Sequence, residues 1–462
     1  MGWRGIPPAA GSHVGSSAHG RRNRRSGSVG GMKRGLRRTA AVVAGALLVG
    51  SALPAAAATD YAAGNWWFED TGVREAQATA TGEGVTIAVI DSSVNTEAHT
   101  LVGANIRPGG VDSCPDGTPV PVISDDPGSR HGTGVSAVIV GNGQPVGGNP
   151  GIQGVAPGAE VLVYSLGTDE VDSGESWLTT PCPDDPSGYL ATVVQDAVAN
   201  GADMLVFTSL QIFDTVSATA LLQAIKAGVI VVAGNPNDSA MADPVSPNAP
   251  GVEQFNGVVS VENFGPEGER DDPVVGPWLS IVAPGDKFLS YEPGEDLSWS
   301  EPVILGASNS LATPFVAGVL ALVMEAYPEA TPNQVLQSLV HTASHAQPDP
   351  VHTDEEGWGR IDVPRLMATD PSQFPDENPL IREDGIPTPA MYDEGVFSDE
   401  FGPYPLEPVT PDDGASDDPE GAPTPAPMGD GVPILLVVLL VLAAIVVIGV
   451  VVLIIVLATR RR

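Results

Sequence analysis

The chain has 462 residues, enough for one large domain with additional segments, and its formal net charge is −36. All 57 acidic residues follow residue 58, whereas 12 of the 21 basic residues lie in the first 38 positions or in the last three. A surface this acidic repels phosphate backbones, so we expect no nucleic-acid partner.

The first segment, residues 1–58, has the composition of a targeting signal. From Met32 it reads MKRGLRRTAAVVAGALLVGSALPAAAATD, a basic stretch followed by a short apolar stretch and by small residues near Ala58. This order predicts a secretory signal that is cleaved near Ala58. The glycine- and serine-rich residues before Met32 have no core-forming pattern, which makes Met32 a candidate start codon.

Residues 84–368 have the pattern of an α/β domain. Apolar, β-branched runs predict buried strands: GVTIAVID, GAEVLVYSL, ADMLVFTSL, GVIVVAGN and GVVSVENF. Helical patterns lie between and after them: GYLATVVQDAVANG, SATALLQAIKAG and TPFVAGVLALVMEAYP. This alternation predicts a mainly parallel sheet with helices on both faces, which binds ligands at the carboxyl ends of its strands. We expect Trp66, Trp67 and Phe68 to pack the preceding segment, residues 59–83, against this domain.

Three segments follow the domain. Residues 369–431 are rich in Pro, Asp, Glu and Gly and predict an extended acidic tether, although its stretch NPLIREDGIPTPAMYDEGVF has enough apolar residues to dock on a globular surface. Residues 432–459 contain an uncharged apolar run long enough to cross a bilayer as one helix, and the basic residues 460–462 should stay in the cytoplasm. We therefore expect an extracytoplasmic domain on one C-terminal membrane anchor.

Three polar residues stand where a predicted strand ends or a predicted helix begins. Asp91 ends GVTIAVID, His131 opens HGTGVSAVIVG, and Ser310 opens the long helix after GASN. An acyl-transfer site needs a hydroxyl, a base that takes its proton and a carboxylate that orients the base, and a helix start offers free N–H groups to an oxyanion. Each residue also has a plain interpretation as a turn, helix-start or N-cap residue, so nucleophile and cap both remain open for Ser310.

Together these motifs resemble those of the subtilisin-like serine proteases. The resemblance covers about residues 60–368 and rests on VIDSSV, HGTGVSAVIVG, GVAPGAEVLVYSL, VVAGN, VAPGDKFLS, SLATPFVAGVLALV and GWGRID. It implies an endopeptidase with Ser310 as nucleophile, His131 as general base and acid, and Asp91 as the orienting carboxylate. It also implies an oxyanion hole made by the Asn235 amide and the Ser310 backbone N–H. An extended protein or peptide substrate would pair with three residues: Ser209, Leu210 and Gln211.

The order of the segments points to one subgroup of this family. A secretory signal, an early segment, a protease domain, a proline-rich tether and a C-terminal anchor resemble the mycosins, the membrane-anchored proteases of actinobacterial type VII secretion systems. This resemblance implies that residues 59–83 wrap the catalytic domain and that the protein associates with membrane components of the secretion channel.

The sequence departs from the usual family motifs around the nucleophile. Where the family reads Gly-Thr-Ser-x-Ala-x-Pro, this chain has Ser308-Asn309-Ser310. Ser308 is an alternative nucleophile, but Pro314 follows Ser310 at the family spacing of four residues, which favours Ser310.

Two further departures bear on the carboxylate and on the cleft. Asp91-Ser92-Ser93 replaces Asp-Thr-Gly or Asp-Ser-Gly: Ser92 keeps a hydroxyl for the carboxylate, while Ser93 would be strained if a positive φ were required there. A side chain at Gln211, in place of glycine, could crowd the substrate cleft. The alternative hypothesis is therefore a catalytically weak or inactive scaffold that stabilises a membrane secretion complex.

Cys114 and Cys182 are the only cysteines of the chain. An oxidising compartment favours one disulfide between them, with two free thiols as the alternative. Acidic loops such as PDDPSG could hold Ca²⁺, but no ligand spacing matches a defined site, and the histidines form no metal-ligand pattern. We therefore assign no metal and no cofactor.

Overall fold

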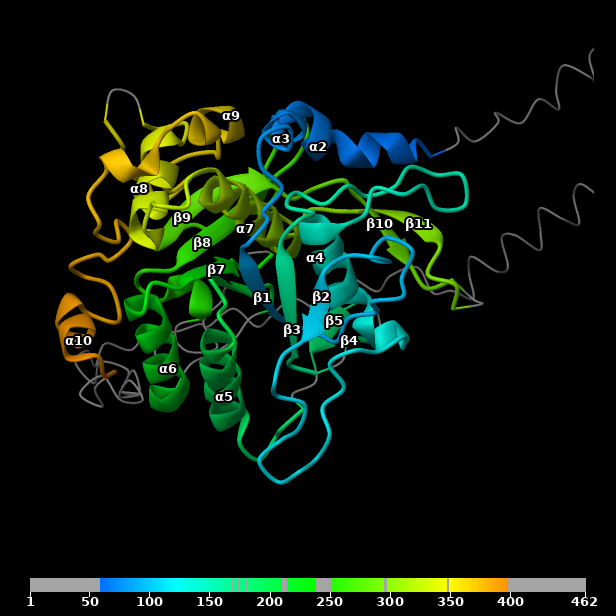
Figure 1. Cartoon of the computed structure of the whole chain (residues 1–462), viewed down its shortest axis with the longest axis horizontal. Helices are drawn as coiled ribbons and strands as arrows, with labels where there is room; N and C mark the ends of the chain where they lie inside the picture. The colour runs from blue at the N-terminus through cyan, green and yellow to red at the C-terminus, as the bar shows by residue number, and fades with distance from the viewer. Residues whose placement is uncertain are drawn as a thin grey trace, which may run out of the picture. The chain divides into compact units, whose positions relative to one another are not determined.

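A seven-stranded parallel sheet forms the centre of the structure (Figure 1). This computed structural model describes residues 59–167, 169–172, 175–178, 181–209, 214–237, 251–294, 297–346 and 349–397. The strand order is β2-β3-β1-β6-β7-β8-β9, and every neighbouring pair is parallel. The strands are β1 (Thr86–Asp91), β2 (Ile106–Pro108), β3 (Glu160–Ser165), β6 (Met204–Phe207), β7 (Ile230–Gly234), β8 (Val259–Phe264) and β9 (Leu279–Pro284). The predicted mainly parallel sheet is confirmed.

Strand β1 shows why the sheet is covered on both faces. Ile87 and Val89 belong to one apolar core, whereas Ala88 and Ile90 belong to the other, and all four side chains are buried. Alternate residues of a strand point to opposite faces, so a strand that is apolar at every position needs a helical layer on each side.

The helices form these two layers. The first core contains α4 (Arg130–Val140), α7 (Asn309–Ala326), α8 (Pro332–Thr342) and α9 (Val363–Met367). The second contains α5 (Pro186–Ala199) and α6 (Thr215–Lys226), which lie side by side, with the short elements η3 (Val252–Gln254) and α10 (Pro389–Glu394) (Figure 1). Helices on both faces of the sheet are thus confirmed.

Smaller elements complete the described part of the chain. Two antiparallel strand pairs stand outside the main sheet, β4 (Asp169–Asp172) with β5 (Glu175–Leu178) and β10 (Phe288–Glu292) with β11 (Glu301–Leu305). The short helical elements are η1 (Tyr61–Asn65), α2 (Trp66–Asp70), α3 (Val73–Ala76), η2 (Pro127–Ser129) and η4 (Pro371–Gln373).

Helix α7 is the central helix of the first core. Within the described ranges it is the one helix long and apolar enough to cross a membrane, but 78% of that stretch is buried inside the domain. Its apolar side chains are therefore part of the protein core. The predicted membrane helix, residues 432–459, and the predicted signal, residues 1–58, lie outside the described residues.

The N-terminal segment packs on α7 and on the β10–β11 pair, as its aromatic residues predict. Trp67 is 1% exposed and stacks on Phe288 at a ring-centroid distance of 5.1 Å, and it makes a T-shaped contact with Phe315 of α7 at a centroid distance of 5.9 Å. At the end of the segment, the N–H groups of residues 81–83 all donate to Oε2 of Glu325, at 2.5, 2.5 and 2.8 Å. The segment is therefore part of the core packing of the domain.

The domain extends past residue 368, the end that the sequence pattern predicts. Leu380, Met391 and Tyr392 are buried, and the Tyr392 hydroxyl donates to the backbone oxygen of Asn256. These apolar side chains lie in the part of the predicted tether that had enough apolar residues to dock. Residues 369–397 therefore form a C-terminal strap on the domain, and residues 398–431 of the predicted tether lie outside the described residues.

Candidate active site

Asp91 and His131 form a hydrogen-bonded pair at the carboxyl end of the sheet. Asp91 is the last residue of β1 and is fully buried, while His131 is the second residue of α4, with 27% of its side chain exposed. Both carboxylate oxygens lie 2.8 Å from His131 Nδ1. Burial acts to raise the pKa of Asp91, but the charge and hydrogen bond of His131, with hydrogen bonds from Thr208 and Ser92, outweigh it and lower that pKa. The carboxylate can therefore hold the imidazole in one tautomer.

The turn after Asp91 positions the start of α4. Gly132 N donates to Ser92 Oγ at 2.9 Å, and a Cβ at position 132 would lie 2.6 Å from the backbone oxygen of Ser92. The Ser92 hydroxyl therefore binds the start of α4 and not the carboxylate. Ser92 contacts the Asp91 carboxylate through its backbone N–H, at 2.5 Å. Ser93 is not among the described non-glycine residues with positive φ, so the strain considered for this position does not arise.

Thr208 joins the carboxylate to the candidate nucleophile. It follows β6, the neighbour of β1, and its hydroxyl donates to Oδ2 of Asp91. Its backbone oxygen accepts a hydrogen bond of 2.9 Å from Oγ of Ser310. Thr208 is not among the site residues predicted from the sequence. Its position directly after a strand is the signal that could have identified it, because polar site residues lie at the carboxyl ends of parallel strands.

Ser308 and Ser310 have different roles at the start of α7. Ser308 is the N-cap, because its Oγ accepts a hydrogen bond of 3.2 Å from the Ser310 N–H, whereas the Ser310 hydroxyl points to Thr208. The structure therefore gives the capping role to Ser308 and connects Ser310 to the carboxylate. A hydroxyl carries one proton, so Ser310 cannot donate to Thr208 and to His131 at the same time.

Asn235, the residue implied for the oxyanion hole, is engaged inside the domain. It follows β7 and is 4% exposed. Its amide nitrogen donates to Glu262 Oε2 at 3.2 Å and to the backbone oxygen of Val274 at 2.9 Å, and its amide oxygen accepts from Ser260 Oγ at 2.8 Å. Both amide protons are used in this state, so the amide would have to turn before it could bind a substrate oxygen.

Asn309, which precedes the candidate nucleophile Ser310 at the place of the family motif's threonine, ties α7 to the end of β7. Its side-chain nitrogen donates to the backbone oxygens of Asn235 and Pro236, at 3.1 and 2.8 Å. Its backbone N–H donates to Asn237 Oδ1 at 2.8 Å. This departure from the family motif thus has a structural function, because it fixes the first turn of the helix that carries Ser310.

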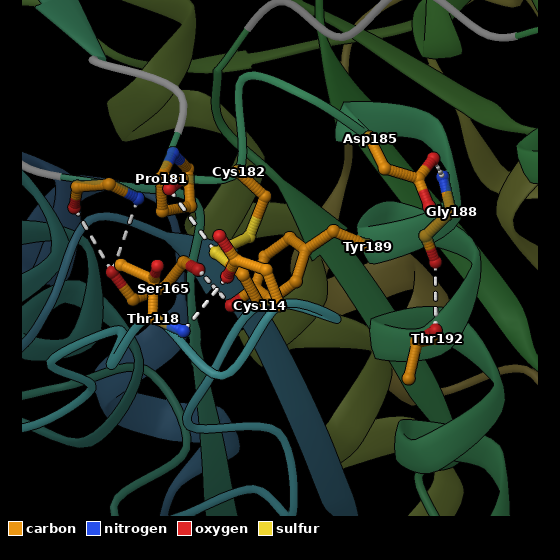
Figure 2. The surroundings of a disulfide bond; sticks show 11 residues. Cys114, Thr118, Ser165, Pro181, Cys182, Asp185, Gly188, Tyr189 and Thr192 are labelled. Carbon is orange, nitrogen blue, oxygen red and sulfur yellow. Dashed lines mark hydrogen bonds between the residues drawn. A yellow bond between two sulfur atoms is a disulfide. The ribbon is translucent and has the colours of Figure 1, made fainter.

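Of the other predicted site residues, the structure describes Ser209 and the two cysteines. Ser209 follows Thr208, whereas Leu210 and Gln211 lie outside the described residues, so the proposed crowding of the cleft stays a prediction. Cys114 and Cys182 form a disulfide with a Cα–Cα distance of 5.5 Å (Figure 2). The bond ties the loop after β2 to the start of α5, and both cysteines belong to the second core. Within the described ranges, no cluster of three or more His, Cys, Asp or Glu side chains could hold a metal ion.

Comparison with known proteins identifies the family. Residues 82–359 match the family model described as "Subtilase family", Peptidase S8. The chain belongs to the subtilases. This subtilase is therefore related to serine proteases that hydrolyse peptide bonds. It is 29% identical over 362 residues to mycosin-1 of Mycolicibacterium smegmatis, a match that covers 69% of this chain and 75% of that protein. It is also 29% identical over 339 residues to mycosin-1 of Mycobacterium tuberculosis, covering 65% and 72%.

Solved structures of relatives share the fold of this subtilase. The crystal structure of MycP1 from Mycobacterium smegmatis is 24% identical, with a TM-score of 0.50 over 70% of this chain and 88% of that one. Fervidolysin from Fervidobacterium pennivorans, a keratinolytic enzyme related to subtilisin, is 22% identical, with a TM-score of 0.51 over 68% and 48%. The subtilisin-like fold implied by the sequence motifs is confirmed.

Proposed function

We propose that this subtilase is a membrane-anchored, extracytoplasmic serine endopeptidase in which Ser310, His131 and Asp91 form the catalytic triad. The observation that carries the proposal is the buried Asp91 carboxylate, with both oxygens 2.8 Å from His131 Nδ1. Thr208 adds support, because it bonds to this carboxylate and to the Ser310 hydroxyl at once. Sequence order alone would not require these residues to share one hydrogen-bond network.

The geometry supports acyl transfer in two steps, acylation of Ser310 and hydrolysis of the acyl-enzyme. The Ser310 hydroxyl turns from the Thr208 oxygen toward His131, gives its proton to Nε2, and Oγ attacks the substrate carbonyl carbon. Asp91 stabilises the imidazolium, which then protonates the leaving amine as the peptide C–N bond breaks. Water, deprotonated by the same imidazole, hydrolyses the acyl-enzyme. The Ser310 N–H and the Asn235 amide would bind the oxyanion after leaving their present partners.

The proposed location rests on the terminal segments. The secretory pattern of residues 1–58 and the uncharged apolar residues 432–459 favour a domain outside the cytoplasmic membrane on one anchor, with residues 460–462 inside. The segment order resembles that of the mycosins of type VII secretion systems, and the similarity to mycosin-1 of two species is in line with it. Both support membrane components of such a system as partners, besides a protein or peptide substrate. We propose residues 398–431 as the tether that links the strap to the anchor.

Labelling with a fluorophosphonate probe tests the nucleophile. The full-length chain and its Ser308→Ala variant should react, whereas Ser310→Ala should not, because only Ser310 is connected to Asp91 through Thr208. Ser308→Ala is the matched control: it removes the helix cap, at a cost of about 1 kcal/mol, and keeps the nucleophile. No labelling of a correctly folded wild-type chain would contradict the proposal.

A second candidate function is a scaffold of a secretion complex with little or no peptidase activity. The observation that favours it is that the Ser310 hydroxyl and both Asn235 amide protons have partners inside the protein. Secretion measured in a gene-deletion strain separates the two functions. Restoration by Ser310→Ala as complete as by the wild type would favour the scaffold, whereas failure of Ser310→Ala at normal protein level would favour the peptidase.

A further inference from the structure

Glu262 is a buried carboxylate beside the proposed oxyanion residue, and the mechanism above does not use it. It lies in β8 and is 1% exposed. Its Oε2 accepts hydrogen bonds from the side-chain nitrogens of Asn235 and Asn309, both at 3.2 Å. A buried carboxylate is a strong acceptor, so it competes with any other oxygen for the Asn235 amide.

The two asparagines depend on Glu262 to different degrees. The Asn309 side-chain nitrogen has two backbone acceptors besides Glu262, the oxygens of Asn235 and Pro236. The Asn235 nitrogen has one other acceptor, the oxygen of Val274. An amide nitrogen carries two protons, so loss of the Glu262 bond frees one proton of Asn235 while Asn309 stays satisfied.

We propose that Glu262 is a latch on the oxyanion hole: its ionised carboxylate holds the Asn235 amide inside the domain, and neutralisation of the carboxylate releases this amide toward the substrate oxygen. The inference rests on the proposed function, in which Asn235 binds the oxyanion. Glu262 itself does not contact the substrate; it is a positioning residue that acts through Asn235.

The electrostatic setting makes this latch responsive near neutral pH. Burial raises the pKa of Glu262 to about 7, and the Asn235 hydrogen bond, the charge of Arg270 and the Asn309 hydrogen bond act in the opposite direction. Arg270, in the loop after β8, is the charged side chain that acts on Glu262, and it interacts in turn with Glu356 and Arg360. A protonated carboxyl is a weaker acceptor, so the latch opens as the pH falls through about 7.

Labelling rates test the latch without a known substrate, since the phosphonyl oxygen of a fluorophosphonate occupies the oxyanion position. The full-length chain in detergent micelles and its Glu262→Gln variant are labelled between pH 6 and pH 9. At pH 9 we expect the variant to react about fivefold faster, because a neutral amide oxygen holds Asn235 less strongly than a carboxylate. At pH 6 the ratio of the two rates should approach one. The ratio cancels any pH dependence that the two proteins share.

Asn235→Ala supplies the matched control. In that background Glu262→Gln should give no gain at pH 9, because the gain acts through the Asn235 amide. An equal rate for the wild type and Glu262→Gln at pH 9, or a gain that persists without Asn235, would overturn the latch.

A second readout is independent of activity and of any change at Glu262. In a ¹⁵N-asparagine-labelled Ser310→Ala chain, the side-chain NH₂ signal that Asn235→Ala removes should shift with a midpoint near the pKa of Glu262, about 7. An Asn235 signal that does not respond to pH overturns the latch, even if Glu262→Gln fails to fold. If the Ser310→Ala chain shows this shift but the wild-type chain reacts with no fluorophosphonate, the proposed peptidase is refuted and the control of Asn235 by Glu262 still stands.

Discussion

Glu253 should make the domain less stable as the pH rises. The residue lies in η3, is 3% exposed, and its Oε2 has no hydrogen-bond partner in the described part of the chain. Burial raises the pKa of Glu253 from 4.5 to about 7. The unfolded chain therefore loses this proton near pH 4.5, but the folded chain keeps it up to about pH 7. Between these values the folded state binds more protons, so stability falls with rising pH and is constant above them.

The size of the effect follows from the shift. Each pKa unit corresponds to about 1.4 kcal/mol, so Glu253 should remove about 2.5 kcal/mol of stability between pH 5 and pH 8. Glu253→Gln abolishes this loss, because the amide does not titrate. Any constant cost of burying the amide changes the unfolding free energy equally at both pH values. The difference between the two free energies therefore reports only the titration of the carboxylate.

The assay is guanidinium unfolding of residues 59–431 at pH 5 and pH 8, followed by tryptophan fluorescence. Ser310→Ala in every sample prevents self-digestion. Glu97→Gln, which removes a negative charge from an exposed side chain, controls for the change in net charge. The reasoning is refuted if Glu253→Gln loses as much stability between the two pH values as the parent protein does. Glu262 should add a loss of the same sign, because burial also raises its pKa to about 7.

Three further outcomes are expected from single substitutions. Thr208→Val removes the hydrogen bond to Asp91 but keeps the branched shape, so fluorophosphonate labelling should slow about tenfold while the melting temperature changes little; an unchanged rate would show that Asp91 does not need this bond. Cys114→Ser opens a bridge between residues 68 positions apart and should lower the unfolding free energy by about 4 kcal/mol, measured by denaturant titration with and without reductant; a reductant-insensitive parent protein would contradict this. Gly132→Ala places a Cβ 2.6 Å from a backbone oxygen of the Asp91 turn and should abolish labelling of a folded protein, whereas Gly134→Ala, whose nearest contact is 3.6 Å away, should not.

The fold and part of the site could be predicted because they depend on local patterns. Apolar β-branched runs predict the parallel strands, and the rule that parallel sheets bind ligands at their carboxyl ends selects Asp91. Thr208 satisfies the same rule and could have been found, since it directly follows the strand that pairs with β1. The sequence pattern predicts too early an end of the domain, because Leu380 and Tyr392 are isolated in a proline-rich stretch, where no periodic pattern indicates their burial.

The orientation of the side-chain amide of Asn235, the proposed oxyanion residue, could not be predicted in this way. The bond from Asn235 to Glu262 depends on the register of β7 and β8, which pairs Gly234 with Val261 and so brings their successors side by side. No residue near Asn235 in the sequence indicates that a buried carboxylate binds its side chain. The motif VVAGN therefore identifies the residue, but it does not show where the amide points.

The contact between Trp67 and Phe315 has a consequence for the order of folding. These two residues are 248 positions apart in the sequence, yet each forms part of the same core. Whether the chain leaves the ribosome or crosses a membrane with its N-terminal end first, Trp67 is exposed long before α7 is available to cover it. Contacts of such long range form slowly, so the early segment should need protection from aggregation until nearly the whole domain has emerged.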